Sequence, residues 1–344
     1  MQAVVLRKTG GPEGMALEEV PTPEVTEGRV LVRVRACGVA HRDIIERSGG
    51  NRLLSPPIVQ GHEFAGEIVE IGPGVQRWRP GDRVVNLYTD SCGTCEHCTS
   101  GEERLCPGVT EAYGLTVNGG YAQFALVRER GLEALPDGIP WEQAAILMSA
   151  VGVGYNNVVT TAAVRPDEHV LVTGATGGVG LAAVETARLI GARVWAVTSS
   201  PAKKAHLEAM GLEHVLVDDT GSFHKMVRER RPQGVDAVID CVGAPTLHAS
   251  IRSLRRFGRV AVVGTLEQAR VELALGYTVI NSIKILGSDN VSRQALREVM
   301  ALAAEGRLSA RVDRVLPLGQ AAEAHQLIED RKAFGRIVLV PDHD

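Results

Sequence analysis

The chain has 344 residues, a formal net charge of −4 and a hydrophobic content of 44%. At roughly 100–200 residues per domain this length predicts about two domains, and the composition excludes a wholly disordered or fibrous chain. A mildly acidic chain without a long basic run is poorly suited to binding nucleic acid. No apolar run reaches the ~18 residues of a membrane-spanning helix. The first residues also lack a secretory signal, so we expect a cytoplasmic protein with no membrane partner.

Residues 1 to about 125 predict a β-rich module with little helix. Short runs of β-branched residues alternate with turns that contain Gly and Pro, which is typical of strands joined without intervening helices. The predicted strands cover residues 30–34, 66–71 and 82–86. This pattern favours a barrel-like arrangement of strands.

A cluster of cysteines follows these strands. Four of the six cysteines fall within fifteen residues, in the pattern Cys-x2-Cys-x2-Cys-x7-Cys: Cys92, Cys95, Cys98 and Cys106. In a chain without a secretory signal, such clustering indicates a metal site rather than a disulfide framework. Four thiolates form the closed tetrahedral site of a structural zinc ion. An iron–sulfur cluster is the alternative, but the last spacing is longer than the ferredoxin pattern. We therefore predict one structural zinc ion on these thiolates, with His97 as a surface residue between them.

From about residue 150 onward, predicted strands and helices alternate. The strands are expected at 169–173, 192–197, 235–240 and 259–263, and the helices at 180–191, 202–210 and near 245–254. This alternation predicts an α/β domain with a doubly wound parallel sheet. A further helix is expected at 293–305 and a strand at 336–340.

A glycine-rich turn connects the first of these strands to its helix. Its residues are Gly174, Ala175, Thr176, Gly177, Gly178, Val179 and Gly180. In dinucleotide-binding folds such glycines permit a tight turn and a close approach of the backbone to a pyrophosphate, which lies at the helix N-terminus. The strand before the turn and the helix after it supply the context that this motif requires. We predict that the turn binds a dinucleotide, together with Gly243, Gly264 and Ser288 in later loops.

The end of the second strand indicates which dinucleotide is bound. An acidic residue about 20 residues beyond the turn would bind the ribose 2′-hydroxyl of NAD. The chain instead has Thr198, Ser199 and Ser200, followed by Lys203 and Lys204 on the next helix. Hydroxyl and cationic groups without a carboxylate favour the 2′-phosphate of NADP(H). In the alternative interpretation, the two lysines are solvated helix residues.

Several motifs together resemble those of medium-chain, zinc-type alcohol dehydrogenases. They are residues 61–69 (GHEFAGEIV), 80–84 (PGDRV) and 335–339 (GRIVL), and the cysteine lobe and the glycine-rich turn appear in the family's order. The resemblance implies a GroES-like catalytic domain formed by residues 1–150 and 291–344, with its zinc lobe at 92–106. It implies a Rossmann coenzyme domain formed by residues 151–290, and a homodimer or homotetramer.

The same resemblance implies that the family's catalytic zinc is missing. Ala40 occupies the position of the first ligand, a cysteine, and Arg42 that of the hydroxyl residue that relays protons. His62 keeps the second ligand position, whereas Ser149 takes the place of the third, again a cysteine. One histidine with the neighbouring Glu63 does not provide three protein ligands. The alternative is a rebuilt zinc site made of Cys37, His62 and Glu63.

Zinc-free members of the superfamily include quinone oxidoreductases, enoyl reductases and acryloyl-thioester reductases, and the chain resembles this branch most. We expect an NADPH-dependent reductase that transfers hydride to an activated double bond in an α,β-unsaturated carbonyl, a quinone or an enoyl thioester. Negative charge then develops on the substrate oxygen and requires a fixed donor, for which His62, His41 and Arg42 are the candidates. The alternatives are an alcohol or carbonyl dehydrogenase with an atypical catalytic zinc, and a non-enzymatic NADPH-binding protein.

Overall fold

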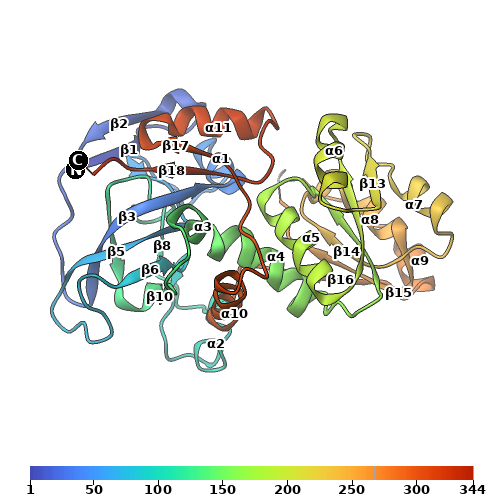
Figure 1. Cartoon of the computed structure of the whole chain (residues 1–344), viewed down its shortest axis with the longest axis horizontal. Coiled ribbons are helices and arrows are strands. Elements are labelled where there is room, and N and C mark those ends of the chain that lie inside the picture. The colour runs from blue at the N-terminus through green and yellow to red at the C-terminus, as the bar shows by residue number, and fades with distance from the viewer. Residues whose placement is uncertain (266–268, 344) are drawn as a thin grey trace. The chain divides into compact units, whose positions relative to one another are not determined.

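The structure is a computed structural model that describes residues 1–265 and 269–343 (Figure 1). The chain divides into two compact units. Unit 1 comprises Met1–Ala150, Val291–Gly306 and the residues from Ala310 onward, and unit 2 comprises Val151–Asn290 and Arg307–Ser309. No helix among the described residues is long and apolar enough to cross a membrane.

Unit 1 is rich in strands. Its main sheet contains β3 (Arg29–Val39), β5 (Phe64–Ile71), β6 (Arg83–Asn86), β9 (Phe124–Arg128), β10 (Leu132–Ala134), β17 (Val312–Pro317) and β18 (Arg336–Val340). Their order is β10-β6-β5-β3-β18-β17, and β9 also pairs with β3. Two smaller sheets are formed by β1 (Gln2–Leu6), β2 (Met15–Glu19) and β4 (Ile58–Val59), and by β7 (Thr89–Asp90) and β8 (Glu111–Ala112). The β-rich module predicted for the N-terminal part is confirmed.

The main sheet forms around β3. Val30, Val32 and Val34 of this strand are fully buried, and the strand pairs antiparallel with β5, β9 and β18. Pairing with β18 sets Leu339 opposite Cys37. A strand from the C-terminal part of the sequence therefore lies beside the segment that leads into the first helix.

The helical segments of unit 1 position the polar side chains of its interior. They include α1 (His41–Arg47), α2 (Glu96–Thr99), α3 (Trp141–Ala145), α10 (Arg293–Ala304) and α11 (Ala321–Glu329). Helix α1 begins immediately after β3, where the Asp43 carboxylate accepts a hydrogen bond of 2.8 Å from the Ala40 N–H. The π-helical turn Leu147–Val151 carries Ser149. Such turns are rare and often occur at functional sites.

Unit 2 contains a six-stranded parallel sheet. Its strands are β11 (His169–Thr173), β12 (Arg193–Thr198), β13 (His214–Val217), β14 (Val235–Asp240), β15 (Leu254–Val262) and β16 (Lys284–Gly287). Their order is β13-β12-β11-β14-β15-β16, which is the order of a dinucleotide-binding sheet. The helices of the unit include α4 (Gly152–Asn156), α5 (Gly178–Ile190), α6 (Pro201–Ala209), α7 (His224–Arg230), α8 (Ala244–Ser253) and α9 (Leu275–Ile280). The predicted doubly wound parallel sheet is confirmed.

Two strands of unit 2 were not predicted, and one begins earlier than expected. Strands β13 and β16 are four-residue edge strands, and β16 lacks the buried apolar run that marks a central strand. Strand β15 begins at Leu254, which pairs with Val235 of β14. The register between the two strands then shifts, and regular pairing resumes at Arg259, opposite Ala237. Short or irregular strands of this kind leave a weak pattern in the sequence.

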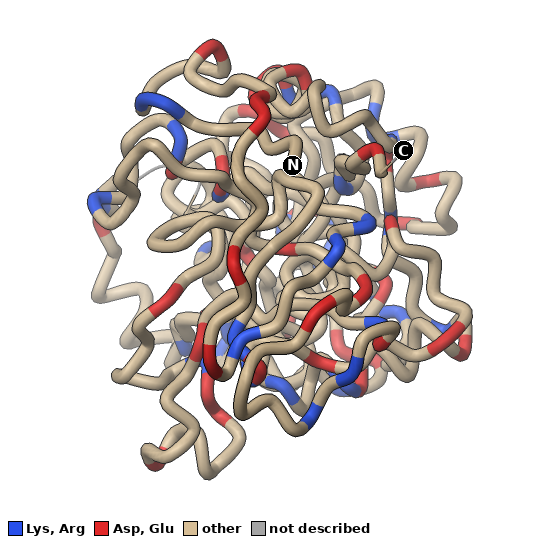
Figure 2. The backbone as a smooth tube through the Cα atoms, turned by 90° about the vertical axis from the view of Figure 1, so that its left-hand side faces the viewer, with Lys and Arg blue, Asp and Glu red and all other residues tan. Residues whose placement is uncertain are grey.

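Basic and acidic residues are intermixed along the backbone (Figure 2), and many of them form ion pairs. The buried Glu133 carboxylate accepts hydrogen bonds from Arg77, Arg293 and Arg297. The Arg293 backbone N–H also donates to Glu103, at 2.8 Å. Glu103 lies between the third and fourth clustered cysteines, so α10 is tied to the cysteine lobe.

Candidate active site and metal centre

The structure brings the four clustered cysteines together. Their ligand atoms all lie within 4.8 Å of one another, and individual sulfur–sulfur distances are 3.9 Å for Cys92–Cys98, 3.5 Å for Cys95–Cys98 and 3.7 Å for Cys95–Cys106. Four sulfurs at ~2.3 Å from a central zinc ion would be about 3.8 Å apart. The thiols are free and far beyond disulfide bonding distance. The donor set and its spacing therefore fit a tetrahedral metal.

Backbone amides of the lobe donate hydrogen bonds to two of the sulfurs. The Cys92 Sγ accepts a hydrogen bond of 3.3 Å from the Cys95 N–H, and the Cys106 Sγ accepts one of 3.3 Å from the Cys92 N–H. Hydrogen bonds from Thr94, and then from Cys95, lower the pKa of Cys92 to about 5. His97 is exposed, as predicted.

The glycine-rich turn has the geometry that close approach to a dinucleotide requires. Gly174 has a φ of +57°, and a Cβ on Gly180 would lie 2.2 Å from the Gly174 carbonyl oxygen. Only glycine at these positions lets α5 start directly on the turn. The N-terminus of α5 begins after Gly177, which provides no side-chain cap. Its first amides can therefore bind an anion such as a pyrophosphate.

Two later loops of unit 2 approach each other closely at two of the predicted residues. A Cβ on Gly243 would lie 2.3 Å from the Gly264 carbonyl oxygen, and a Cβ on Gly264 would lie 2.2 Å from the Val242 nitrogen. The loop that carries Gly243 is organised by Asp240, which is fully buried. Its carboxylate accepts hydrogen bonds from the Gly243 N–H (2.9 Å) and the Thr173 hydroxyl (3.0 Å). Sequence reasoning missed Asp240, although an acid that ends an apolar strand is a detectable signal.

The predicted 2′-phosphate residues lie at the end of β12 and the start of α6. The Ser200 hydroxyl caps α6 by accepting from the Lys203 N–H, and Thr198 accepts from the Ser200 N–H. The Lys204 ammonium lies 3.4 Å from the Glu208 carboxylate one turn along the helix. Part of its charge is thus satisfied on the helix surface, as the alternative interpretation expects.

Two further residues lie beside these loops. The Ser288 N–H donates to the Val262 carbonyl at 3.0 Å, and a Cβ on Gly174 would lie 3.6 Å from the Cys241 Cβ. Ser288 follows β16, and its hydroxyl accepts a hydrogen bond of 3.0 Å from the Thr161 hydroxyl. Cys241 follows the carboxyl end of β14 and is partly exposed.

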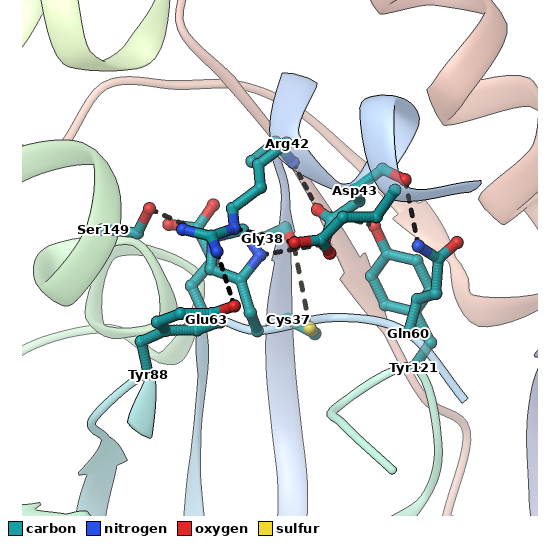
Figure 3. A network of polar contacts seen from close by, with 12 residues as sticks. Cys37, Gly38, Arg42, Asp43, Gln60, Glu63, Tyr88, Tyr121 and Ser149 are labelled. Atoms are coloured by element: carbon teal, nitrogen blue, oxygen red, sulfur yellow. Dashed lines mark hydrogen bonds and ion pairs between the residues drawn. The ribbon is translucent and has the colours of Figure 1, made fainter. Parts of the chain in front are cut away.

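A network of buried polar side chains occupies the interior of unit 1 (Figure 3). Asp43 is at its centre and is fully buried. Its Oδ1 lies 2.8 Å from His62 Nδ1, and its Oδ2 accepts hydrogen bonds from the Ala40 N–H at 2.8 Å and the Tyr121 hydroxyl at 3.3 Å. The Tyr121 oxygen in turn lies 3.1 Å from Nε2 of the buried His325. One carboxylate therefore connects four segments of the chain.

Both ring nitrogens of His62 are engaged by protein groups. His62 Nε2 lies 3.2 Å from the Ser149 hydroxyl oxygen, opposite the contact of Nδ1 with Asp43. The three side chains therefore form a hydrogen-bonded series from a buried acid through an imidazole to a hydroxyl. The ring is 3% exposed, whereas Ser149 is only partly buried.

A buried ion pair lies next to the hydrogen-bonded series Asp43–His62–Ser149. The Arg336 guanidinium is 2.7 Å from the Glu63 carboxylate and donates a hydrogen bond of 3.4 Å to the Ser149 hydroxyl. Gly38 makes room for Glu63, because a Cβ there would lie 2.4 Å from a carboxylate oxygen. Sequence reasoning identified Arg336 only as part of a C-terminal motif and did not assign it a role.

The predicted candidates Arg42 and His41 begin helix α1. The Arg42 guanidinium lies 4.1 Å from the centre of the Tyr88 ring and donates to the Glu46 carboxylate (2.8 Å) and the Tyr88 hydroxyl (2.6 Å). Its side chain is 43% exposed. His41 is partly buried, and burial lowers its pKa.

Charges in the network follow from its contacts. Burial lowers the pKa of His62, but the adjacent Asp43 carboxylate more than compensates, so the pKa of His62 is raised. Burial raises the pKa of Asp43, but the charge and hydrogen bond of His62 outweigh it, so this pKa is lowered. Burial raises the pKa of Glu63 and raises that of Cys37 far above its usual value. His62 and Asp43 therefore form an imidazolium–carboxylate pair.

Two family models match successive parts of the chain. A family model described as the alcohol dehydrogenase GroES-like domain matches residues 26–137, and one described as zinc-binding dehydrogenase matches residues 178–305. The chain is 33% identical to an acryloyl-coenzyme A reductase of Metallosphaera sedula over 340 residues, covering 98% of this chain and 99% of the relative. It is 33% identical to an alcohol dehydrogenase of Geobacillus stearothermophilus over 346 residues, covering 99% of this chain and all of the relative.

A solved structure is also similar over the whole chain. The crystal structure of AibC superposes with a TM-score of 0.92 at 41% sequence identity, covering 100% of this chain and 96% of that one. Together with the family models, this confirms a GroES-like domain and a Rossmann-type parallel sheet.

The Asp43–His62 pair predicts a specific pH dependence of stability. A raised histidine pKa stabilises the fold fully below the ordinary histidine value of 6.5, and this contribution is lost as pH rises through the raised value. The lowered pKa of Asp43 stabilises the fold at pH values above 3.8, the ordinary pKa of an aspartate. We expect Asp43→Asn to lower the free energy of unfolding by about 3 kcal/mol at pH 6 and by much less at pH 9.

Urea unfolding of both proteins at the two pH values measures this difference. Asp137→Asn is the matched control, because the Asp137 side chain is fully exposed, and it should change stability equally little at both values. An equal loss for Asp43→Asn at pH 6 and pH 9 would contradict the assigned charges.

Proposed function

Since the chain belongs to the medium-chain dehydrogenase/reductase superfamily, we propose that it is an NADPH-dependent reductase of activated double bonds that uses no catalytic zinc. The observation that carries this proposal is the engagement of His62, whose Nδ1 contacts Asp43 and whose Nε2 contacts Ser149. The resemblance makes His62 the zinc ligand retained by this chain. Here its ring is part of a hydrogen-bonded chain.

The other candidate ligands support the same conclusion. Ala40 has no side-chain donor atom, and a neutral serine hydroxyl is a poor zinc ligand. For the rebuilt site, Cys37 is a buried thiol whose pKa is raised by burial, and Glu63 is already paired with Arg336. Within the described residues, the four-cysteine cluster alone gathers three or more metal-binding side chains.

The residues of unit 1 supply donors rather than a metal for the substrate oxygen. When bound, NADPH supplies a hydride, and negative charge then develops on the oxygen conjugated to the reduced double bond. The Arg42 guanidinium is held in place by Glu46 and Tyr88 and is partly exposed. A preorganised cation of this kind can stabilise that charge. The guanidinium does not lower the pKa of an alcohol hydroxyl as a zinc ion does, so alcohol oxidation is disfavoured.

The similar proteins support two of the possible activities. An acryloyl-coenzyme A reductase acts on an enoyl thioester by its name, which favours a thioester or carbonyl conjugated to a double bond as the substrate here. The equally similar alcohol dehydrogenase keeps the alternative of a zinc-dependent alcohol or carbonyl dehydrogenase. A non-enzymatic NADPH-binding protein is the second alternative.

Activity assays test the proposal directly. We expect NADPH to be oxidised with enoyl thioesters or enones, and NADP⁺ not to be reduced with primary and secondary alcohols. Mild chelation should leave the rate unchanged. Alcohol oxidation that is abolished by chelation would favour the zinc-dependent alternative, and absence of turnover with every substrate of the panel would favour the binding protein.

We propose that the cysteine cluster holds one zinc ion. Cys95→Ser removes one of four ligands, so we expect zinc content to fall from about one ion per chain and the midpoint of thermal unfolding to fall with it. Cys241→Ser, outside the cluster, is the control and should retain the metal. Full zinc content in Cys95→Ser, measured by mass spectrometry of the metal, would contradict the assignment.

Mass spectrometry of the metal can also test whether zinc binds at the family's catalytic position around His62. Ala40→Cys combined with Ser149→Cys supplies thiols at the two positions where the family has cysteine ligands. This variant should bind about two zinc ions per chain, because His62 then has two thiolate neighbours. Two ions in the unmodified protein would overturn the zinc-free assignment.

We propose that NADPH binds more tightly than NADH through the loop at the end of β12. Thr198 and Ser200 contribute hydroxyls, and Lys203 and Lys204 lie on the first turn of α6. Replacing both lysines by alanine should reduce the preference for NADPH about tenfold, the value of one charge-assisted hydrogen bond. Fluorescence titration with both coenzymes measures this, and Lys225→Ala on α7 is the control. Equal affinities in the unmodified protein would contradict the proposal.

We also propose that the chain self-associates through the edge of the parallel sheet. Strand β16 is an edge strand, and the residues around it include exposed apolar side chains, namely Phe257 (70%), Leu275 (68%), Val279 (73%), Ile280 (72%) and Ile285 (37%). Exposed apolar groups gathered at one edge are typical of an interface. Ile280→Lys should shift sedimentation toward the monomer, whereas Leu53→Lys, a similarly exposed leucine of unit 1 (67%), should not.

A further inference from the structure

Ser149 is the most accessible member of the buried hydrogen-bonded chain. It lies in the π-helical turn Leu147–Val151 and is partly buried, whereas His62 and Asp43 are 3% and 0% exposed. Neither the family matches nor the names of the similar proteins assign this serine a role. In the hydrogen-bonded series Asp43–His62–Ser149, the Ser149 hydroxyl is therefore the group nearest to the surface of unit 1.

The hydrogen bonds around Ser149 determine where its own proton points. A hydroxyl has two acceptor lone pairs and one hydrogen. With His62 as an imidazolium, its Nε2–H donates to the Ser149 oxygen at 3.2 Å, and Arg336 donates to the same oxygen at 3.4 Å. Both lone pairs are then used. The Ser149 O–H is left to donate to a third group.

We propose that Ser149 is a catalytic proton donor, which delivers the proton that completes reduction of the double bond to the α-carbon of the substrate, with His62, Asp43 and Arg336 as positioning residues. This inference rests on the proposed reductase function. It replaces the predicted direct action of His62 on the substrate with an action through the serine.

The proton and electron balance of the step is complete. Hydride from the reduced nicotinamide forms a C–H bond at the β-carbon, and the electrons of the double bond move to form an enolate. The enolate electrons then form the α-carbon C–H bond with the Ser149 proton, while the Ser149 oxygen takes the proton from His62 Nε2. His62 becomes neutral and is protonated again from solvent, so the net change is addition of one hydride and one proton.

The neighbouring groups explain why serine, rather than another side chain, would act. Arginine does not release a proton in proteins, so Arg336 can polarise the Ser149 hydroxyl but cannot protonate carbon. His62 is buried behind the serine. Asp43 holds the imidazole by its Nδ1, as the acid of a hydrolase triad does. The charged groups that face His62 and Asp43 are Arg42 and Glu46 of α1 and Glu63, which Arg336 of β18 pairs. His325 of α11 also faces Asp43, but burial lowers its pKa to about 4, so its ring is neutral.

Isotope and kinetic measurements on Ser149 variants test the proton delivery. In D₂O, the unmodified protein should place deuterium at the α-carbon with one configuration. Ser149→Ala should lower kcat about 100-fold, the lower range for a general acid, with little change in KM and with mixed configuration at that carbon. Ser149→Thr retains the hydroxyl and should restore most of the rate and the single configuration.

A titration of the protein without coenzyme provides a second measurement that does not depend on turnover. NMR of the His62 ring in the full chain should show that Ser149→Ala lowers the pKa of His62, because the acceptor of its Nε2–H is lost, and that Asp43→Asn lowers it further. The resonance of His214, which stacks on Trp195 in unit 2, is the control and should titrate unchanged.

The outcomes separate the two proposals. If the unmodified protein reduces enoyl substrates, and Ser149→Ala does so at a similar rate with the same configuration, the assignment of Ser149 fails while the reductase function stands. If His62 titrates identically with and without the Ser149 hydroxyl, the relay fails as well. If the unmodified protein reduces no activated alkene, the reductase function fails, and the catalytic role of Ser149 fails with it.

Discussion

The contact between the Asp43 carboxylate and the His62 imidazole is the interaction on which the interior of unit 1 depends. The two groups are fully or nearly fully buried and 2.8 Å apart. Either charge alone would destabilise the folded state, because burial favours the neutral form of both groups. Together they remain charged, and the carboxylate still accepts from the Ala40 N–H and the Tyr121 hydroxyl. One carboxylate therefore holds together the start of α1, the loop before β5 and Tyr121, which in turn contacts His325 of α11.

Under the proposed function, this arrangement accounts for the retained histidine in a site that holds no catalytic zinc ion. A zinc ion would compensate the charge of thiolate ligands and orient the histidine. Here Asp43 orients the ring, Ser149 occupies its second nitrogen, and Arg336 balances Glu63. His62 and Glu63 each have a charged protein partner within hydrogen-bonding distance. Under the proposed function, the site acts by hydrogen bonding and proton donation rather than by Lewis-acid activation.

In unit 2, one buried carboxylate and several glycines likewise determine how closely the loops approach each other. Asp240 organises the loop that carries Gly243, and the missing side chains of Gly180, Gly243 and Gly264 let three segments approach more closely than any other residue would permit. A dinucleotide bound at these points would contact largely backbone. Under the proposed function, the preference between NADH and NADPH depends on the side chains after β12, which are few and partly engaged with the protein itself.

The sequence by itself determined those features that rest on local patterns. The alternation of apolar strands and amphipathic helices predicted the parallel sheet, the glycine spacing predicted the turn before α5, and the cysteine spacing predicted a cluster that the structure brings within 4.8 Å. The family resemblance placed His62 and Ser149 at one site, but only the tertiary structure decided the hydrogen-bond partners of each. Asp43 and Ser149 are separated from His62 by 19 and 87 residues, and Arg336 is separated from Ser149 by 187. No local pattern encodes that these side chains meet. Their convergence depends on the pairing of β18 with β3 and on the π-helical turn around Ser149. Both are consequences of burying long-range partners together, which a single sequence does not display.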